Sequence, residues 1–433
     1  MNLPVAGLLL VAFCCSPIAT IDTSLITDSL SLANDLGGFI ESQDFSKTAS
    51  KLISSVSPYL GVIGSVLSFA FSFLPSGPSA ELLAIQKLYK DVTLRFDKID
   101  HQFSAVTREI KWGSIEAHFG DYESTIHTIS HTYQQLVASR SKTEFNSRKY
   151  LFTQAFRSYH KAGEKIYDGI VGQSNLFNGP IFDEAVDHVK WDRKKAQEFM
   201  LGVTKLLISA AGIEVAYYHL TNHHDSAKFI QHDWQVKLET IKSKMNAIDH
   251  KLTTQYGHQL STDVDIDIAN HNSLSNCDLA HEVYTTIAKK YYWRSWIVTV
   301  TDHSTDNHKF IAHACSGTIN QKHSKNVVVS SVDPHKAHLT TTQQHVINSV
   351  HTSHTYHIMH GGKRDLQKRL TGHRRNDADV AYNSFPSAAR TTCSSVYSSI
   401  GVVDKNLHMC SSFAHNRLFT RYDGSYYHVF ASG

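Results

Sequence analysis

The most distinctive hydrophobic pattern is an uncharged stretch over residues 52–80, followed at once by a long amphipathic segment. Between Ile85 and Leu136, apolar residues recur every three or four positions among charged ones, with one five-residue step. This spacing places an apolar stripe on one face of a helix. No proline interrupts residues 81–139. The pattern therefore predicts one helix of roughly 90 Å, which needs partners along its length.

Similar helical spacing continues beyond this segment. Residues 144–172, 182–221 and 225–252 carry apolar side chains at helical intervals and are joined by short connections. Shorter helices are expected within residues 21–57. Long helices with short links predict an elongated antiparallel bundle. No second apolar run like residues 52–80 is expected.

The pattern changes near residue 255. Residues 262–269 alternate acidic and aliphatic side chains, which indicates a strand or a linker, and a helix is expected over residues 278–291. The polar, His-rich segment 337–379 is predicted to be a loop. Residues 423–425, Asp-Gly-Ser, indicate a hairpin turn. Runs typical of strands occupy residues 293–301, 309–315, 326–333, 397–403, 417–422 and 426–431.

These patterns predict an α+β protein, in which an elongated antiparallel helical bundle with an uncharged hydrophobic segment precedes a smaller, β-rich, disulfide-stapled C-terminal domain. The expected order is a signal peptide (1–20), an N-terminal helical segment (21–57), a long-helix bundle (58–256) that includes the hydrophobic segment 58–74, a linker (257–269) and the β-rich domain (270–433).

Residues 1–20 resemble a signal peptide, because a short apolar core precedes small and polar residues. Secretion to an extracellular location is therefore expected. Four cysteines remain after cleavage, and an even number in an exported chain predicts two disulfides. Three pairings are open among Cys277, Cys315, Cys393 and Cys410.

Charge and histidine content affect the expected partners. The net charge of +3 argues against nucleic-acid binding. The 29 histidines would raise the formal charge from +3 to +32 if all were protonated. Three interpretations of the high histidine content are open: compositional drift, a pH-dependent change of conformation, and metal binding.

Motifs of enzymes and metal sites are incomplete. His281 and Glu282 begin a zinc-protease pattern, but Thr285 stands where the second histidine is needed. Asp263, Asp265 and Asp267 resemble the start of a calcium loop that lacks its glycine. The recurrence of His351, His354, His357 and His360 fits metal capture or chance clustering. We expect no enzyme, cofactor or metal.

Three dibasic pairs form a candidate site for anionic surfaces. Three interpretations of these pairs are open: a solvated loop, a site for lipid headgroups or sulfated glycans, and a proteolytic processing site. The pairs are Lys363 and Arg364, Lys368 and Arg369, and Arg374 and Arg375.

The uncharged segment is the candidate for membrane insertion. Residues 58–74 would span about 25 Å as a helix, against a hydrocarbon core of about 30 Å. Interspersed Gly and Ser weaken insertion and allow close packing. A permanently buried bundle helix or hairpin is the alternative. The side chains that would insert are Leu60, Ile63, Val66, Leu67, Phe69, Phe71, Phe73 and Leu74.

Several stretches resemble one family of animal proteins. FDKIDHQFSAVTREIKW (residues 96–112), with the uncharged segment before it, is similar to the signature helix of the cephalotoxin-like and rapunzel-type proteins. GIEVAYYHLT (212–221), WIVTV (296–300) and RYDGSYYHVF (421–430) also resemble them. The resemblance implies a secreted, mostly helical protein and carries no catalytic residues.

The expected function is that of a secreted cephalotoxin-like protein, a membrane-active toxin of the helical pore-forming type. Membrane lipids and copies of the same chain are its expected partners. The alternative is a non-lytic extracellular protein that binds a receptor or glycan through its C-terminal domain.

Overall fold

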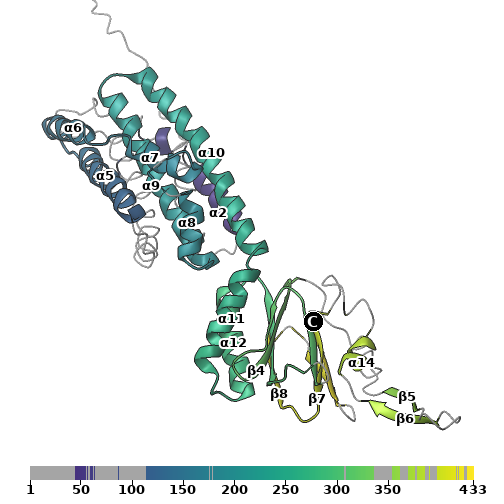
Figure 1. Ribbon diagram of the computed structural model, residues 1–433. Helices are drawn as coiled ribbons and strands as arrows, with labels where there is room; N and C mark the ends of the chain where they lie inside the picture. Colours follow the sequence, from purple (N-terminus) through teal and green to yellow (C-terminus); the bar gives the residue numbers. More distant parts are fainter. Residues whose placement is uncertain are drawn as a thin grey trace, which may run out of the picture. The chain divides into compact units, whose positions relative to one another are not determined.

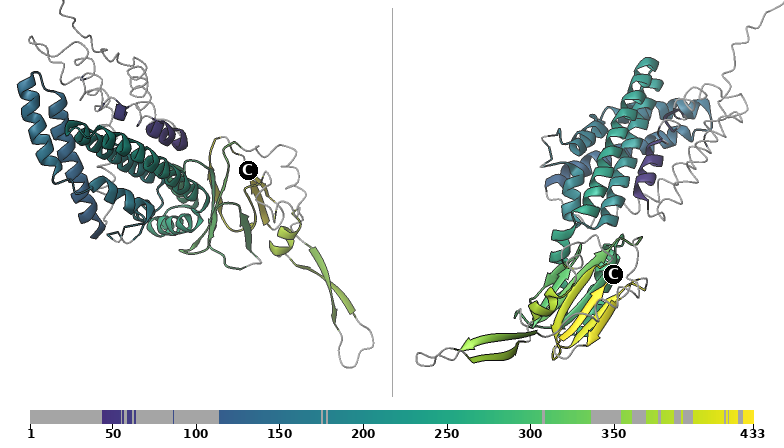
Figure 2. Two further views of the ribbon diagram at one scale, coloured as in Figure 1. Left: turned by 90° about the horizontal axis from the view of Figure 1, so that it is seen from above. Right: turned by 90° about the vertical axis from the view of Figure 1, so that its right-hand side faces the viewer.

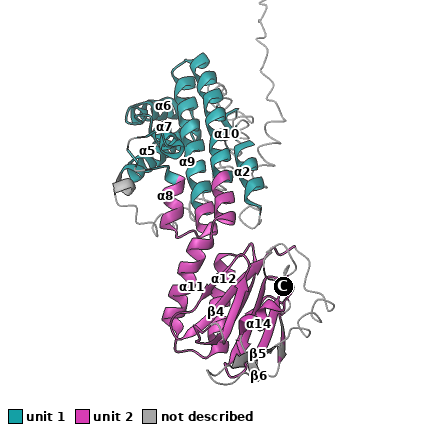
Figure 3. Cartoon of the chain, turned by 45° about the vertical axis from the view of Figure 1, so that its right-hand side comes forward, with its two compact units in different colours: residues 1–181, 198–246 teal, residues 182–197, 247–433 magenta. Residues whose placement is uncertain are grey.

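The computed structural model describes residues 44–54, 56, 59–61, 63, 86, 114–174, 176–177, 179–306, 309–335, 354–360, 369–375, 378–385, 390, 397–415, 417, 419–423 and 427–433. The chain divides into unit 1 (residues 1–181 and 198–246) and unit 2 (182–197 and 247–433), shown in two colours in Figure 3. The predicted signal peptide and the other residues up to 43 lie outside the described part.

Helices make up almost all of the described chain up to residue 254 (Figure 1). Local sequence sets several of their starts. Asp44 caps the first helix, because its Oδ1 accepts from the Lys47 amide at 3.1 Å. Ser141 caps another by accepting from the Glu144 amide at 3.1 Å. The helices are α2 (Phe45–Ser54), α5 (Ser114–Val137), α6 (Lys142–Phe156), α7 (Ala162–Val171), α8 (Ile181–His188), α9 (Arg193–Leu220) and α10 (His224–Thr254).

Two of the predicted long helices are each two helices. The prediction of one helix over residues 144–172 is wrong, because His160 and Lys161 take left-handed backbone angles between α6 and α7. The prediction over residues 182–221 fails for the same reason, with Lys190 and Trp191 left-handed between α8 and α9. Neither turn contains Gly or Pro, so the sequence carried no ordinary breaker. The helices predicted over residues 225–252 and 278–291 are confirmed.

Residues 182–197 and the end of α10 belong to unit 2, and beyond α10 this unit continues with two helices that precede an antiparallel β structure. Helices α11 (Gly257–His271) and α12 (Asn276–Lys290) come first. One sheet has the strand order β3-β4-β1-β8 and the other β2-β7-β10-β9. The strands are β1 (Ser295–Asp302), β2 (Phe310–Ala314), β3 (Thr318–Asn320), β4 (Lys325–Val332), β7 (Ser399–Asp404), β8 (Met409–Phe413), β9 (Phe419–Asp423) and β10 (Tyr427–Ser432).

The core of unit 2 has three apolar layers. Helices α11 and α12 pack on one face of the first sheet, where Trp296, Val298 and Val329 are fully or almost fully buried (Figure 1). Phe310, Val328 and Phe430 fill the space between the two sheets. The short helix α14 (Ala378–Asn383) covers β7 and β10 on the other face of the second sheet. Because β1, β4, β7 and β10 are covered on both faces, they read as continuous apolar or small-residue runs.

Most predicted strands are confirmed within two or three residues, and so is the hairpin between β9 and β10. Two other expectations are wrong. Residues 257–269, expected to be a linker, belong to α11, because Leu260, Val264 and Ile268 recur at helical spacing and are fully buried. The segment 337–379, expected to be a loop, contains the antiparallel pair β5 (His354–His360) and β6 (Arg369–Arg375), a separate ribbon in Figures 1 and 2. The α+β class is confirmed.

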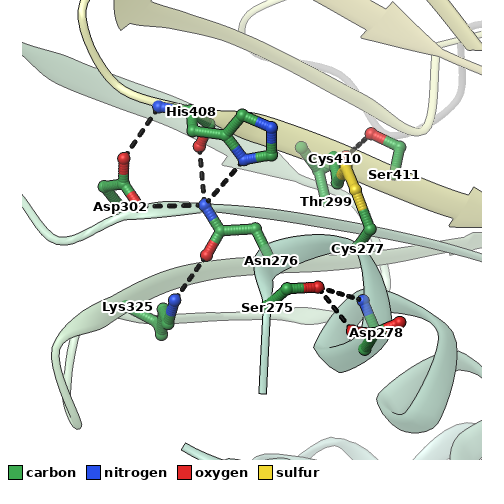
Figure 4. The surroundings of a disulfide bond; sticks show 10 residues. All are labelled: Ser275, Asn276, Cys277, Asp278, Thr299, Asp302, Lys325, His408, Cys410 and Ser411. Carbon is green, nitrogen blue, oxygen red and sulfur yellow. Dashed lines mark hydrogen bonds between the residues drawn. A yellow bond between two sulfur atoms is a disulfide. The ribbon is translucent and has the colours of Figure 1, made fainter. Parts of the chain in front are cut away.

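One disulfide links α12 to β8. Cys277 and Cys410 are bonded, with their Cα atoms 4.9 Å apart (Figure 4). Beside them, the Asn276 side chain donates to the His408 carbonyl at 2.8 Å and to Asp302 Oδ1 at 3.0 Å, and its Oδ1 accepts from Lys325. Cys315 is also disulfide-bonded, and Cys393 lies outside the described residues. Disulfides are typical of oxidising compartments.

We predict that non-reducing peptide mapping recovers Cys277 with Cys410 and Cys315 with Cys393. The first pair is set by the junction of α12 and β8, and the second contains the two remaining cysteines beyond residue 20. Recovery of Cys277 with Cys315 or with Cys393 in folded protein would contradict this arrangement.

Candidate functional site

Helix α9 has the length and composition of a membrane span. It is the one helix of that kind among the described residues, with a mean hydropathy of 1.6 over its most apolar 18-residue window. Within the bundle, 89% of that window is buried, as expected for a core helix. From Phe199 to Leu220 its Asp, Glu, Lys and Arg residues are Lys205 and Glu214, and both are buried. The expectation that no second apolar run follows residues 52–80 is therefore wrong.

Glu214 places a carboxyl group inside the apolar core of unit 1. Its side chain is 5% exposed. The Tyr159 hydroxyl donates to Oε1 at 2.6 Å, and the Trp234 indole N–H donates to Oε2 at 2.8 Å. The Gly163 amide in turn donates to the Tyr159 hydroxyl at 3.0 Å. The turn after α6, helix α7 and helix α10 thus meet at one side chain of α9.

The environment of Glu214 favours its neutral form. Burial raises the pKa of Glu214 from 4.5 to about 7, although the hydrogen bonds from Tyr159 and Trp234 lower it. Glu164 on α7 raises it further and Lys237 on α10 lowers it. Lys237 also pairs with Asp233 at 2.7 Å and with Glu164 at 3.5 Å, so its charge is shared. Glu214 is therefore poised to change its charge close to neutral pH.

The start of the predicted insertion segment packs on α9. A Cβ placed on Gly212 would lie 2.8 Å from Ile63 Cδ1 and 3.2 Å from Tyr59 Cε1. Leu60 and Ile63 have no exposed surface. Absence of a side chain at position 212 therefore lets Tyr59 and Ile63 lie close to the backbone of α9, two positions from Glu214.

A histidine pair lies at the corner between α9 and α10. His219 Nδ1 and His224 Nδ1 are 3.3 Å apart. Burial lowers the pKa of His219, and the nearby His224 and Lys228 lower it further. His223 in the same turn contacts the Thr221 hydroxyl at 3.0 Å. When both rings of the pair are protonated, two cations face each other at this corner.

The sequence-predicted site residues are only partly described. Of the insertion candidates, Leu60 and Ile63 are buried, and Val66, Leu67, Phe69, Phe71, Phe73 and Leu74 lie outside the described residues. Of the basic candidates, Arg369, Arg374 and Arg375 lie on β6, where they pair in register with His360, Thr355 and His354. Lys363, Arg364 and Lys368 lie outside the described part.

Sequence reasoning missed Glu214, although a signal was available. A single acidic residue within an otherwise apolar run, GIEVA, needs partners when it is buried. Its partners are 55 and 20 positions away. Only the tertiary structure identifies them.

Comparison with known proteins finds a family match in the helical part of the chain. Residues 75–273 match the model of the cephalotoxin-like middle helical domain. Protein rapunzel of Danio rerio is 18% identical over 213 residues, which cover 49% of this chain and 91% of that protein. No solved structure matches the chain significantly.

We predict that Glu214→Gln removes a pH-dependent cost of folding. The amide can accept from Trp234 and donate to Tyr159, as the protonated acid does. Because the native pKa is raised, the unfolded chain binds fewer protons than the native one between pH 4.5 and about 7, so wild-type stability falls as pH rises through that window. The variant should gain up to about 3 kcal/mol on wild type by pH 8 and about 1 kcal/mol or less at pH 5.

Urea denaturation at several pH values measures this difference. Glu239→Gln on α10 is the matched control, because the Glu239 side chain is 57% exposed. A gain for Glu214→Gln that is the same at pH 5 and pH 8 would show that the carboxyl is not held neutral by its surroundings.

Proposed function

We propose that this chain, whose residues 75–273 match the cephalotoxin-like middle helical domain, is a secreted, membrane-active protein that inserts α9 after mild acidification. The observation that carries the proposal is the burial, within one bundle, of a membrane-length helix whose acidic side chain has a pKa of about 7. The disulfide and the leader-like residues 1–20 support secretion. The action proposed is physical and requires no catalysis.

The charge on Glu214 is the main barrier to insertion that pH can remove. An ionised acidic side chain at the bilayer centre costs roughly 2.5–3.5 kcal/mol on an insertion scale. Protonation removes most of that cost, and transfer to hydrocarbon favours the neutral form further. The 28 residues of α9 reach about 42 Å as a helix, which exceeds a hydrocarbon core of about 30 Å.

Acidification also weakens the bundle at the end of α9. The pKa of His219 is lowered, so the unfolded chain takes up this proton before the native one as pH falls through about 6.5. The stability contributed by neutral His219 is therefore lost in acid. Glu214 has the opposite effect on folding, because its protonated form is the one that the core accepts. We propose that His219 opens the corner while Glu214 becomes compatible with lipid.

The insertion segment and α9 would act together. Tyr59 and Ile63 cover Gly212, and α9 also carries Gly202, Ser209, Ala210 and Ala211. Small residues allow close helix contacts in a bilayer, which supports self-association of inserted chains.

We predict that the full mature chain releases a trapped dye at pH 5.5, but not at pH 7.4, from vesicles of phosphatidylcholine with phosphatidylserine. Glu214→Gln should move the half-maximal release to higher pH by about half a unit or more, because position 214 then carries no charge at any pH. Gly212→Leu should also release dye at higher pH, because it displaces Ile63 and Tyr59.

Gly120→Leu is the matched control for the glycine change, since no atom lies within 4 Å of a Cβ at that position. Absence of release at both pH values, or identical pH profiles for wild type and Glu214→Gln, would contradict the proposal.

The second candidate is binding of a receptor or glycan without lysis. The β5–β6 ribbon favours it, because β6 carries Arg369, Arg374 and Arg375 on one short strand. Saturable cell binding that depends on these arginines, with no dye release, would favour this function over the first.

A further inference from the structure

A cluster of three possible metal ligands lies between α11 and α12, apart from the α9 site. One ligand atom from each of Asp267, His271 and Glu282 lies within 4.8 Å of the other two. Asp267 and His271 are four positions apart on α11, so they share one helix face. Glu282 comes from α12, which packs beside α11 through the common core of unit 2.

The buried Asp267 carboxylate of this cluster lacks one of the hydrogen-bond partners that buried acids normally have. The Asp267 side chain is 10% exposed, and its Oδ1 contacts His271 Nδ1 at 3.0 Å. Its Oδ2 is buried and has no hydrogen-bond partner. In the described part of the chain, no Lys or Arg forms an ion pair with Asp267 or Glu282. An ordinary ion pair with His271 would account for Oδ1 alone, and leaves the buried Oδ2 without a partner.

We propose that Asp267, His271 and Glu282 bind one divalent transition-metal ion of the zinc class. Two carboxylates and one imidazole are ligands that such ions accept, and the positive charge would satisfy the buried oxygen. At metal–ligand distances of about 2.0–2.2 Å, tetrahedral ligand atoms lie roughly 3.4 Å apart. Asp267 Oδ1 and His271 Nδ1, 3.0 Å apart, are already close to that spacing, and side-chain torsions of Glu282 can adjust its distance to them while the two helices stay in place.

The other cluster of suitable type is excluded by its chemistry. Cys277, His408 and Cys410 also lie close together. Both of its sulfur atoms are used in the disulfide and cannot act as thiolate ligands. The sequence pattern at His281 and Glu282 thus contains one true candidate ligand, whose partners come from α11 instead of position 285.

The test is calorimetric titration of the full oxidised chain with Zn²⁺ at pH 7. The chain has 29 histidines, so weak additional binding is expected and the comparison between variants decides. Wild type should bind one more tight equivalent of Zn²⁺ than the double variant Asp267→Asn/Glu282→Gln. His271→Gln, which keeps both carboxylates, should weaken that equivalent at least about tenfold. His281→Gln, at an exposed neighbouring position on α12, should leave it unchanged.

Thermal unfolding supplies a second measurement. Zn²⁺ should raise the melting temperature of wild type and His281→Gln more than that of the double variant, because binding to the native state adds stability by mass action. The proposal would be overturned if wild type and the double variant bound the same number of tight Zn²⁺ equivalents. It would also be overturned if His281→Gln lost the tight equivalent as the double variant does. If the double variant does not fold, unchanged tight binding by folded His271→Gln would overturn it.

Discussion

The buried carboxyl of Glu214 is the constraint around which the described core of unit 1 is arranged. A carboxyl group in an apolar core needs hydrogen-bond donors, and it finds them on two different elements. Tyr159 can reach Oε1 because the chain turns sharply after α6, with His160 and Lys161 left-handed. Trp234 reaches Oε2 from α10. The break between α6 and α7 therefore places Tyr159 against Glu214, and the packing of α10 on α9 places Trp234 against the same side chain.

Unit 2 is held together by different means. Its apolar layers, from α11 and α12 through two sheets to α14, bury both faces of the central strands. The Cys277–Cys410 bond and the hydrogen bonds of Asn276 hold the start of α12 against the strand that follows it by more than 100 residues. The disulfide limits the freedom of the unfolded chain and thereby stabilises this unit.

Elements set by local interactions were predictable from the sequence, and features set by long-range interactions were not. Helices and strands with regular apolar spacing, such as α10 and β4, were predicted well because the pattern itself is local. Residues 257–269 were misread, because alternating Asp residues outweighed the helical spacing of Leu260, Val264 and Ile268. Among these acids, Asp263 pairs with Lys290 and Tyr291, and Asp265 with Asn320. Those partners lie 27 to 55 positions away, so no local pattern could assign them.

The candidate sites show the same limit. The uncharged segment was recognised from composition, but α9 was not, because Lys205 and Glu214 interrupt its hydrophobicity. Only the fold shows that both are buried and that Tyr59 and Ile63 pack on Gly212. The incomplete motif at Glu282 likewise gained its partners from a neighbouring helix.

Direct titration of Glu214 tests the account most simply. Carbon-13 NMR of side-chain-labelled glutamate, with Glu214→Gln to assign the signal, would follow this carboxyl in the intact chain. The account predicts a midpoint near the pKa of about 7 that burial imposes. A midpoint near 4.5, the ordinary value, would contradict it, because α9 would then keep its charge throughout mild acidification.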